Sequence, residues 1–389
     1  MRLLVVTQDF PPAVGGIETY TAELVRRWAE RGDVEVVAPR LSGADAVDAQ
    51  MPVSVTRVPV RPDLLPLAAL AVVPMRARAQ RADVAFHAQW QTVGASLLAR
   101  RLTGYPRRIV CAAHGRELLF NPAEGLPALG EGYDALRRLL LHGPDVFTPV
   151  STYTAGLLRD NGVSSARLHV VPNGTNPDRF RPMDAAAVRN DLGLDDQTVL
   201  LTVGRLVPRK GIDTTLRALP SVLDAVPDLT YLVVGTGPDR ARLEALARDL
   251  GVREHVRFAG EVAFDALPHY YNAADLFVMP SREDPPDVEG FGIVFLEAGA
   301  CGLPVVGARS GGIPDAVHEG ETGLLVPPAD PTALSETLAR VLTTPDLAAR
   351  LGQQGRHHAV HEASWDHVAD QLWAVLASAS EAAPPTGPS

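Results

Sequence analysis

The chain has 389 residues, of which 46% are hydrophobic, and this length fits a globular protein of two domains with about 200 residues or slightly fewer each. The net charge of −10 is unevenly spread, because residues 1–180 carry 20 Lys and Arg against 17 Asp and Glu, whereas the remainder carries 16 against 29. The first half is therefore neutral to basic and suits an anionic acceptor or a membrane surface, but its Arg clusters lack interleaved aromatic residues, which argues against nucleic acid as a partner.

The first half alternates short β-branched runs with amphipathic helical stretches such as Thr19–Glu30. The run at the N-terminus breaks at Gln8-Asp9 and is too short for a signal peptide, so we interpret it as a first strand. The pattern predicts strands at Leu3–Phe10, Val34–Ala38, Val53–Val60, Asp83–Phe86, Ile109–Ala113, Val146–Val150 and Leu168–Val171.

A turn-rich stretch from Pro172 to Asp178 interrupts the series, and we place a linker there. Beyond it, helices such as Thr214–Ala225 and Arg240–Leu250 again alternate with apolar runs. The second series of predicted strands is Val199–Val203, Thr230–Val234, Val256–Ala259, Leu276–Met279, Pro304–Ala308 and Leu324–Val326. Alternating strands and helices predict parallel sheets covered on both faces.

The end of the chain is helical, with segments predicted at Pro331–Leu342, Asp346–His357 and Ser364–Ala379. We therefore predict an α/β fold of two doubly wound, Rossmann-like domains, residues 1–172 and 173–363, with a ligand cleft at the carboxyl ends of their strands. The last helix, residues 364–380, is long enough to cross back to the first domain, and residues 381–389 are expected to be disordered.

Several other classes of protein lack their sequence signals here. Cys111 and Cys301 are too few for a disulfide framework and fit buried thiols in a reducing cytoplasm. The longest apolar stretch is about a dozen residues, whereas a membrane span takes roughly 20. The only His pair at metal-ligand spacing, His357 and His361, has no further ligand motif and falls where two helices are predicted to join, so we expect a surface cluster and no metal.

Two nucleotide and hydrolase motifs are also absent. Gly235-Thr236-Gly237 lacks the third glycine of a dinucleotide fingerprint, because Arg240 occupies that place. No G-x-S-x-G motif is present, so a nucleophile elbow is not expected.

Two carboxylates flank a glycine-rich turn in the segment Glu289-Gly-Phe-Gly-Ile-Val-Phe-Leu-Glu297. The glycines present bare backbone N–H groups at the start of a short apolar helix, which suits a phosphate or the oxygens of a sugar. If the helix starts near Phe291, Glu297 lies one to two turns inside it and Glu289 stays in the loop. One acid can then reach a sugar and the other a ribose; the alternative is a loop acid and a solvated helix acid.

Lys210 is the only lysine among the 36 basic residues, and it follows a predicted strand and precedes a helix. An ammonium acts as a point charge on phosphate, where a guanidinium is a planar fork. We therefore expect Arg205 and Lys210 to bind a diphosphate together, the alternative being a chance lysine on a surface loop.

Three further motifs end predicted strands and lie at the expected cleft. Gly15-Gly16 and Gly311-Gly312 each open a helix, where a glycine pair lets the backbone approach a ligand or simply makes a tight turn. His114 follows the strand Ile109–Ala113, so its side chain is either a ligand contact or a structural histidine.

Taken in order, these motifs resemble the donor-binding half of the family 4 retaining glycosyltransferases of the GT-B fold, and the resemblance extends over the whole chain. It is carried by Gly204-Arg205 with Lys210, Pro280-Ser281, Glu289-Gly290-Phe291-Gly292, Glu297-Ala298, Gly302 to Val306, Gly311-Gly312 and Gly323 to Val326, with Gly15-Gly16, His114 and Val171 to Gly174 in the first half. In detail the chain is similar to bacterial mannosyltransferases that act on phosphatidylinositol mannosides.

The resemblance implies a role for each of these residues. Arg205 and Lys210 would bind the donor diphosphate, and Glu297 the ribose hydroxyls. The donor sugar would be held by Glu289 with the backbone of Gly290, Phe291 and Gly292, and by His114 from the other domain, while Gly16 lets the first domain approach the phosphates. The chain departs from the family pattern at Arg282–Pro286, a proline-rich stretch that leaves the identity of the donor open.

By the same resemblance, the chain transfers a hexose, mannose from GDP-mannose, to a lipid-linked or glycan hydroxyl with retention of configuration and without a metal or other cofactor. The enzyme would be cytoplasmic, with peripheral contact to the inner membrane face. The alternatives are a UDP-sugar-dependent transferase of the same fold, a nucleotide-sugar epimerase, a phosphorylase, or a non-catalytic nucleotide-binding module.

Overall fold

The computed structural model describes residues 1–122 and 127–381 and divides the chain into two compact units. Unit 1 comprises Met1–Asn173 together with the segment that begins at Trp365, and unit 2 comprises Gly174–Ser364. The border between Asn173 and Gly174 lies inside the turn-rich stretch from Pro172 to Asp178.

Unit 1 is built on a parallel six-stranded sheet of order β3-β2-β1-β4-β5-β6. Its strands are β1 (Arg2–Val6), β2 (Asp33–Pro39), β3 (Ser54–Val58), β4 (Val84–His87), β5 (Arg108–Ala113) and β6 (Val146–Pro149). Its helices are α1 (Gly16–Trp28), α2 (Ala44–Asp48), α3 (Leu65–Gln80), α4 (Val93–Thr103), α5 (Arg116–Leu119), α6 (Pro127–Leu141), α7 (Thr152–Asp160) and α16 (Trp365–Glu381). The strands β4 and β5 are buried along their whole length, as expected of a parallel sheet covered on both faces.

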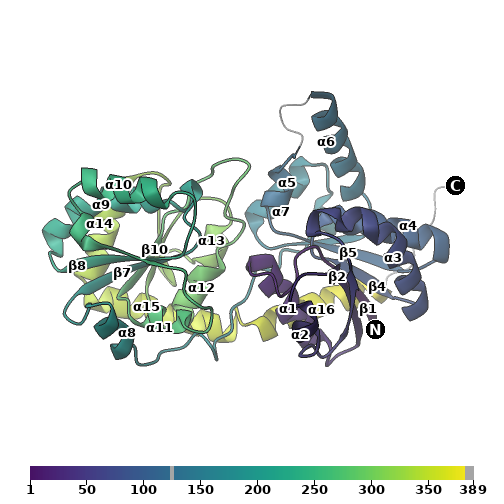
Figure 1. The fold of residues 1–389 in the computed structure, drawn as a ribbon, viewed down its shortest axis with the longest axis horizontal. Helices are drawn as coiled ribbons and strands as arrows, with labels where there is room; N and C mark the ends of the chain where they lie inside the picture. Colours follow the sequence, from purple (N-terminus) through teal and green to yellow (C-terminus); the bar gives the residue numbers. More distant parts are fainter. Residues whose placement is uncertain (123–126, 382–389) are drawn as a thin grey trace. The chain divides into compact units, whose positions relative to one another are not determined.

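Unit 2 repeats the architecture with a parallel sheet of order β12-β11-β10-β7-β8-β9. Its strands are β7 (Thr198–Val203), β8 (Leu229–Val234), β9 (Val256–Gly260), β10 (Leu276–Met279), β11 (Val305–Ala308) and β12 (Gly323–Val326). Its helices are α8 (Ala186–Asp191), α9 (Ile212–Ala225), α10 (Arg240–Asp249), α11 (Leu267–Asn272), α12 (Ile293–Ala300), α13 (Ile313–Ala316), α14 (Pro331–Leu342) and α15 (Pro345–His361). Figure 1 shows α9, α10 and α14 gathered on one face of this sheet and α11, α12 and α15 on the other. The predicted pair of doubly wound α/β sheets is confirmed.

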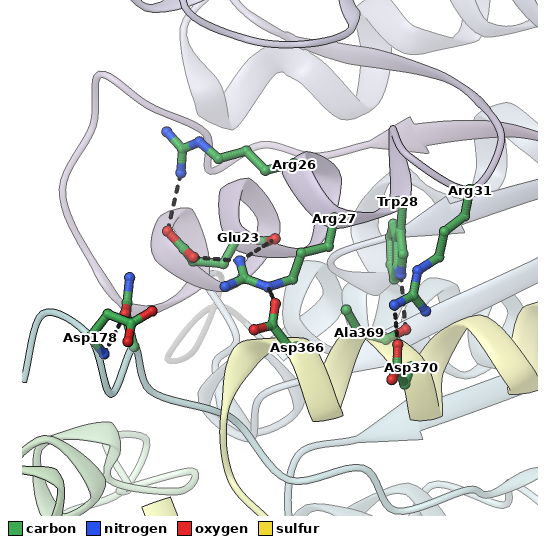
Figure 2. A network of polar contacts seen from close by, with 10 residues as sticks. Glu23, Arg26, Arg27, Trp28, Arg31, Asp178, Asp366, Ala369 and Asp370 are labelled. Carbon is green, nitrogen blue, oxygen red and sulfur yellow. Dashed lines mark hydrogen bonds and ion pairs between the residues drawn. The ribbon is translucent and has the colours of Figure 1, made fainter. Parts of the chain in front are cut away.

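The last helix, α16, packs on unit 1 beside α1, as Figure 1 shows, although nearly 200 residues of unit 2 separate it from the rest of unit 1 in sequence. The indole N–H of Trp28 donates a hydrogen bond to the carbonyl oxygen of Ala369 at 3.2 Å. Arg27 lies 2.5 Å from Asp366 and Arg31 pairs with Asp370, so two ion pairs flank this contact (Figure 2). The predicted return of the C-terminal helix to the first domain is therefore correct.

Two local predictions are wrong, and each failure has a physical reason. The segment Leu168–Val171 is not a strand: it makes one bridge to Phe147, and its pairing ends at Pro172, which has no N–H to donate. His357 and His361 do not lie between two helices, because α15 is continuous to His361. Residues 382–389 of the predicted tail lie outside the described residues, and Glu381, predicted to begin that tail, is the last residue of α16.

Candidate active site

Lys210 and Glu289, predicted to serve one site although they are 79 positions apart in sequence, are in direct contact. Lys210 ends a short 3-10 turn, Pro208–Lys210, that follows β7, and only 7% of its surface is exposed. Its Nζ lies 2.6 Å from Oε2 of Glu289, and the guanidinium of Arg209 reaches the same oxygen at 2.5 Å. Two cations therefore converge on one carboxylate oxygen.

The charges of this cluster decide the ionisation of Glu289. Burial alone would raise the pKa of this carboxyl, but the adjacent Lys210 and Arg209 outweigh it and lower the pKa to about 2. Burial also lowers the pKa of Lys210, against the stabilising charge of Glu289. Glu289 is therefore ionised at neutral pH, and its Oε1 accepts no hydrogen bond from the part of the chain that the structure describes.

The second glycine pair holds the backbone of Glu289. The amide of Gly312 donates to the carbonyl oxygen of Glu289 at 2.8 Å. Gly311 has a φ of 55°, and a Cβ at this position would lie 2.3 Å from the same oxygen. Only glycine allows this approach, so Gly311-Gly312 packs against the loop that carries Glu289 and fixes its backbone.

Glu297 lies in the second turn of α12, as predicted, while Glu289 stays in the loop before it. The alternative of a solvated helix acid is wrong, because Glu297 is only 9% exposed. The hydroxyl of Tyr271 donates to its Oε2 at 2.6 Å. Burial raises the pKa of Glu297 to about 7, although the Tyr271 hydrogen bond and the charges of Lys210 and Arg179 oppose the rise.

Arg205, predicted to act with Lys210, lies in the loop after β7 with its side chain exposed. Its guanidinium makes no hydrogen bond or ion pair with any residue in the ranges 1–122 and 127–381, although its carbonyl oxygen accepts from the N–H of Val207 at 3.0 Å. The guanidinium that joins Lys210 on Glu289 belongs to Arg209 instead. Sequence analysis missed this role although Arg209 is the neighbour of the only lysine, and it missed Tyr271, for which no motif gave a signal.

The proline-rich segment Arg282–Pro286, which precedes Glu289, is hydrogen-bonded to the loop that carries Lys210. Arg282 donates to Asp213, at the start of α9, from its two terminal guanidinium nitrogens, Nη1 and Nη2, at 2.8 and 3.1 Å. Its backbone N–H donates to the carbonyl oxygen of Arg209 at 2.8 Å. Arg282 therefore fixes the backbone beside Lys210.

In unit 1, His114 follows β5 and is held by its neighbours. Its Nε2–H donates to the carbonyl oxygen of Ala88 at 3.1 Å, and its backbone N–H donates to Glu117 at 2.6 Å. Burial lowers the pKa of His114 to about 4, so the ring is neutral at pH 7 with the proton on Nε2 and a lone pair on Nδ1. Gly16, the other predicted residue of this half, is the exposed first residue of α1.

Two histidines of α15, His357 and His361, contact each other. The rings of His357 and His361 lie 4.6 Å apart. Within the described ranges, no group of three or more His, Cys, Asp or Glu side chains is placed to hold a metal ion.

Two family models match most of the chain. The model of the family described as "Glycosyltransferase Family 4" matches residues 14–179, and that of "Glycosyl transferases group 1" matches residues 184–358. The two matches correspond closely to the two compact units.

Two curated relatives span nearly all of this sequence. The GDP-mannose-dependent alpha-(1-6)-phosphatidylinositol monomannoside mannosyltransferase of Mycolicibacterium smegmatis is 38% identical, with 98% of this chain and 99% of the relative aligned. The D-inositol 3-phosphate glycosyltransferase of Acidothermus cellulolyticus is 34% identical, over 94% of this chain and 86% of the relative.

A solved structure supports the fold. HepE of Anabaena, crystallised with UDP, superposes with a TM-score of 0.81 at 21% identity, covering 97% of this chain and all of HepE.

Proposed function

Because this chain belongs to the group 1 and family 4 glycosyltransferases, we propose that it transfers mannose from GDP-mannose to a hydroxyl of a phosphatidylinositol mannoside. The observation that carries the proposal is the 38% identity to a mannosyltransferase of this type over 98% of the chain. An epimerase, one of the alternatives that the sequence left open, has no support.

The site of unit 2 supplies the electrostatics that such a transfer needs. Breaking the bond between the sugar and the diphosphate builds negative charge on the leaving group. The ammonium of Lys210 and the free guanidinium of Arg205 follow the same strand, β7, and would stabilise that charge. Loss of one preorganised group of this kind costs on the order of 3 kcal/mol of barrier.

The two acids and His114 would orient the donor. Glu289 is ionised and fixed through Oε2, so its free Oε1 can accept hydrogen bonds from hydroxyls of the sugar. Glu297 would accept from the ribose hydroxyls in the same way. The lone pair on Nδ1 of His114 would accept from a further sugar hydroxyl.

We propose that the reaction retains the anomeric configuration. The acceptor oxygen attacks the anomeric carbon on the face that the diphosphate leaves, so that one carbon–oxygen bond forms as another breaks. The acceptor proton passes to an oxygen of the departing diphosphate. GDP and the mannosylated acceptor are the products, and the atoms balance without an added reactant.

We propose further that the transfer needs no metal ion, because Lys210 and Arg205 would neutralise the charge of the diphosphate. Chelation by EDTA should leave the rate of GDP release unchanged. A loss of activity that Mg²⁺ or Mn²⁺ restores would overturn this part of the proposal.

We also propose that unit 1 contacts an anionic membrane surface on the cytoplasmic side. Cys111 and Cys301 are free and buried, which fits a reducing compartment. No helix within residues 1–122 and 127–381 is long and apolar enough to cross a bilayer. A peripheral contact would bring the enzyme to a lipid-linked acceptor.

The surface that supports this contact lies on α3 and around the end of α4, and we call it the Arg–Met surface. An open groove of about 900 Å³ is lined there by Met75, Arg78, Ala79, Arg81, Thr103 and Tyr105. Met75 is 63% exposed and nearby Leu102 is 66% exposed. Arg78 and Arg81 are exposed and make no ion pair with a described residue, whereas Arg76 of the same cluster is paired with Glu35.

The test of the activity is direct. The purified protein is supplied with GDP-mannose and a phosphatidylinositol monomannoside, and GDP release and the mass of the lipid product are followed. We expect release that depends on the acceptor and an added hexose with the α-configuration in the product. Turnover with UDP-sugars but not with GDP-mannose would overturn the donor, and turnover with D-inositol 3-phosphate in place of the lipid would overturn the acceptor.

A further inference from the structure

A buried tyrosine, Tyr271 of α11, is hydrogen-bonded to Glu297. Its hydroxyl lies 2.6 Å from Oε2 of Glu297, and the side chains of both residues are buried. The other oxygen, Oε1, accepts no hydrogen bond from the described residues. The carboxylate is therefore fixed at one end and available at the other.

Aromatic packing fixes the tyrosine in turn. Its ring meets Phe180 edge to face at 5.7 Å and lies 5.9 Å from Phe277 at 43°. Burial, followed by the charge of Glu297, raises the pKa of Tyr271 far above its ordinary value, so the hydroxyl keeps its proton and donates. The hydroxyl is therefore protonated at neutral pH, and its ring is packed against two aromatic side chains.

We propose that Tyr271 is a positioning residue that holds Glu297 with Oε1 directed to the ribose hydroxyls of the nucleotide donor. This inference rests on the proposed nucleotide-sugar substrate. It deepens the proposal because it names the group that prepares the ribose contact before the donor arrives. A carboxylate that is already oriented loses less entropy on binding than one that must be ordered.

Other charged groups also act on Glu297, and they must be separated from the contribution of the Tyr271 hydrogen bond. Lys210 and Arg179 favour the ionised carboxylate, and Cys301, which follows one turn later, caps the C-terminal end of α12. None of these side chains makes a hydrogen bond to Glu297 among those that the structure describes. Tyr271 therefore provides the directional hydrogen bond, whereas the two cations stabilise the negative charge of Glu297 without a direct contact.

The experiment compares Tyr271→Phe with Tyr231→Phe in the full-length protein. Tyr231 is a matched control, because it is buried in the same unit and its hydroxyl bonds to Thr202 at 2.8 Å, away from Glu297. Titration calorimetry with GDP at neutral pH should show affinity reduced about tenfold by Tyr271→Phe, the size of one hydrogen bond to a charged group, and unchanged by Tyr231→Phe. The Tyr271→Phe defect should shrink as the pH is raised, because a carboxyl that has lost its donor needs a higher pH to ionise.

A double-mutant cycle separates this role from a merely structural one. With 2′,3′-dideoxy-GDP, which lacks both ribose hydroxyls, wild type and Tyr271→Phe should bind equally. On a Glu297→Gln background, Tyr271→Phe should add no further loss of GDP affinity. Equal weakening by both tyrosine variants, or a Tyr271→Phe defect that persists with the dideoxy nucleotide, would overturn the inference.

UDP is titrated in parallel, because it carries the same ribose. If the wild type binds UDP and not GDP, the proposed mannose donor is wrong, and the positioning role is judged on UDP. If GDP binds and the cycle shows no coupling, the positioning role is wrong and the proposed transfer is untouched.

Discussion

Both acids of the candidate site use one carboxylate oxygen inside the protein and leave the other free. Glu289 gives its Oε2 to Lys210 and Arg209, whereas Glu297 gives its Oε2 to Tyr271. Two cations make Glu289 strongly acidic, with a pKa of about 2, although burial opposes them, while burial raises the pKa of Glu297 to about 7. The two acids therefore differ in charge near neutral pH, which agrees with separate roles toward the sugar and the ribose.

Substitution of Arg205 tests the prediction that Arg205 and Lys210 bind the donor diphosphate together. Its guanidinium is exposed, so Arg205→Ala should leave the midpoint of thermal unfolding unchanged while it weakens GDP binding about 10- to 100-fold, the range for a hydrogen bond to a charged group. Arg217→Ala, which removes another exposed arginine on α9, is the control and should change neither quantity. Equal GDP affinity in both variants would leave Arg209 as the guanidinium to examine next to Lys210.

Glu297 predicts how donor affinity depends on pH. Its folded pKa of about 7 means that the ionised form, the better acceptor for ribose hydroxyls, increases through neutrality. The KM for GDP-mannose should therefore fall as the pH rises from about 6 to about 8, and Glu297→Gln should remove this dependence. The sign for stability is opposite: the folded state keeps this proton above the ordinary pKa of 4.5, so this group lowers the stability of unit 2 as the pH rises from there to about 7.

At the scale of elements, the site consists of turns that pack closely against one another at glycine residues. The loop before α12 rests on the turn before α13 because Gly311 and Gly312 pack against the backbone of Glu289. Gly292, the N-cap that precedes α12, has a φ of 99°, and a Cβ there would lie 2.8 Å from the ring of Phe295. Short helices therefore start where the chain can turn tightly.

Gly311→Ala should damage the site more than the strain of its backbone alone explains. Gly320→Ala is the matched control, because Gly320 also has a positive φ, of 76°, but a Cβ there meets no atom within 4 Å. Both variants should lose about 1–2 kcal/mol from left-handed strain. Only Gly311→Ala should also displace Glu289 and weaken GDP binding, as urea unfolding and calorimetry on both variants would show. Unchanged GDP affinity in Gly311→Ala would contradict the supporting role of this turn.

The elements also mark how far the sequence could predict the structure. The period of apolar residues predicted the six strands of each sheet and several of the helices, but it also predicted a strand at Leu168–Val171 that does not form. The E-x7-E spacing placed Glu297 in a helix and Glu289 in a loop. The sequence could not assign a role to Tyr271 or Arg209. Tyr271 contacts a residue 26 positions away and Arg209 contacts one 80 positions away, and no local pattern encodes such contacts. It also expected a break before His361, where packing of α15 on α12 keeps the helix continuous.

At the scale of the whole molecule, a net charge of −10 would repel an anionic membrane if it were evenly spread, so the neutral-to-basic first half is needed for contact. The Arg–Met surface should bind phosphatidylcholine vesicles that contain phosphatidylinositol, and should not bind phosphatidylcholine alone. Each arginine near such a surface contributes about 1 kcal/mol, so reversing both charges with Arg78→Glu/Arg81→Glu should weaken co-sedimentation at least about 30-fold.

The control for this prediction reverses two exposed arginines of unit 2, in Arg217→Glu/Arg248→Glu, and alters the net charge by the same amount. Vesicle binding should persist in this control, and added salt should weaken the binding of the wild type, because the attraction is screened. Equal loss of binding in the two double variants would mean that net charge, and not the Arg–Met surface, governs contact with the membrane. If the surface brings the enzyme to its acceptor, Arg78→Glu/Arg81→Glu should also slow transfer to vesicle-embedded acceptor while leaving GDP affinity unchanged.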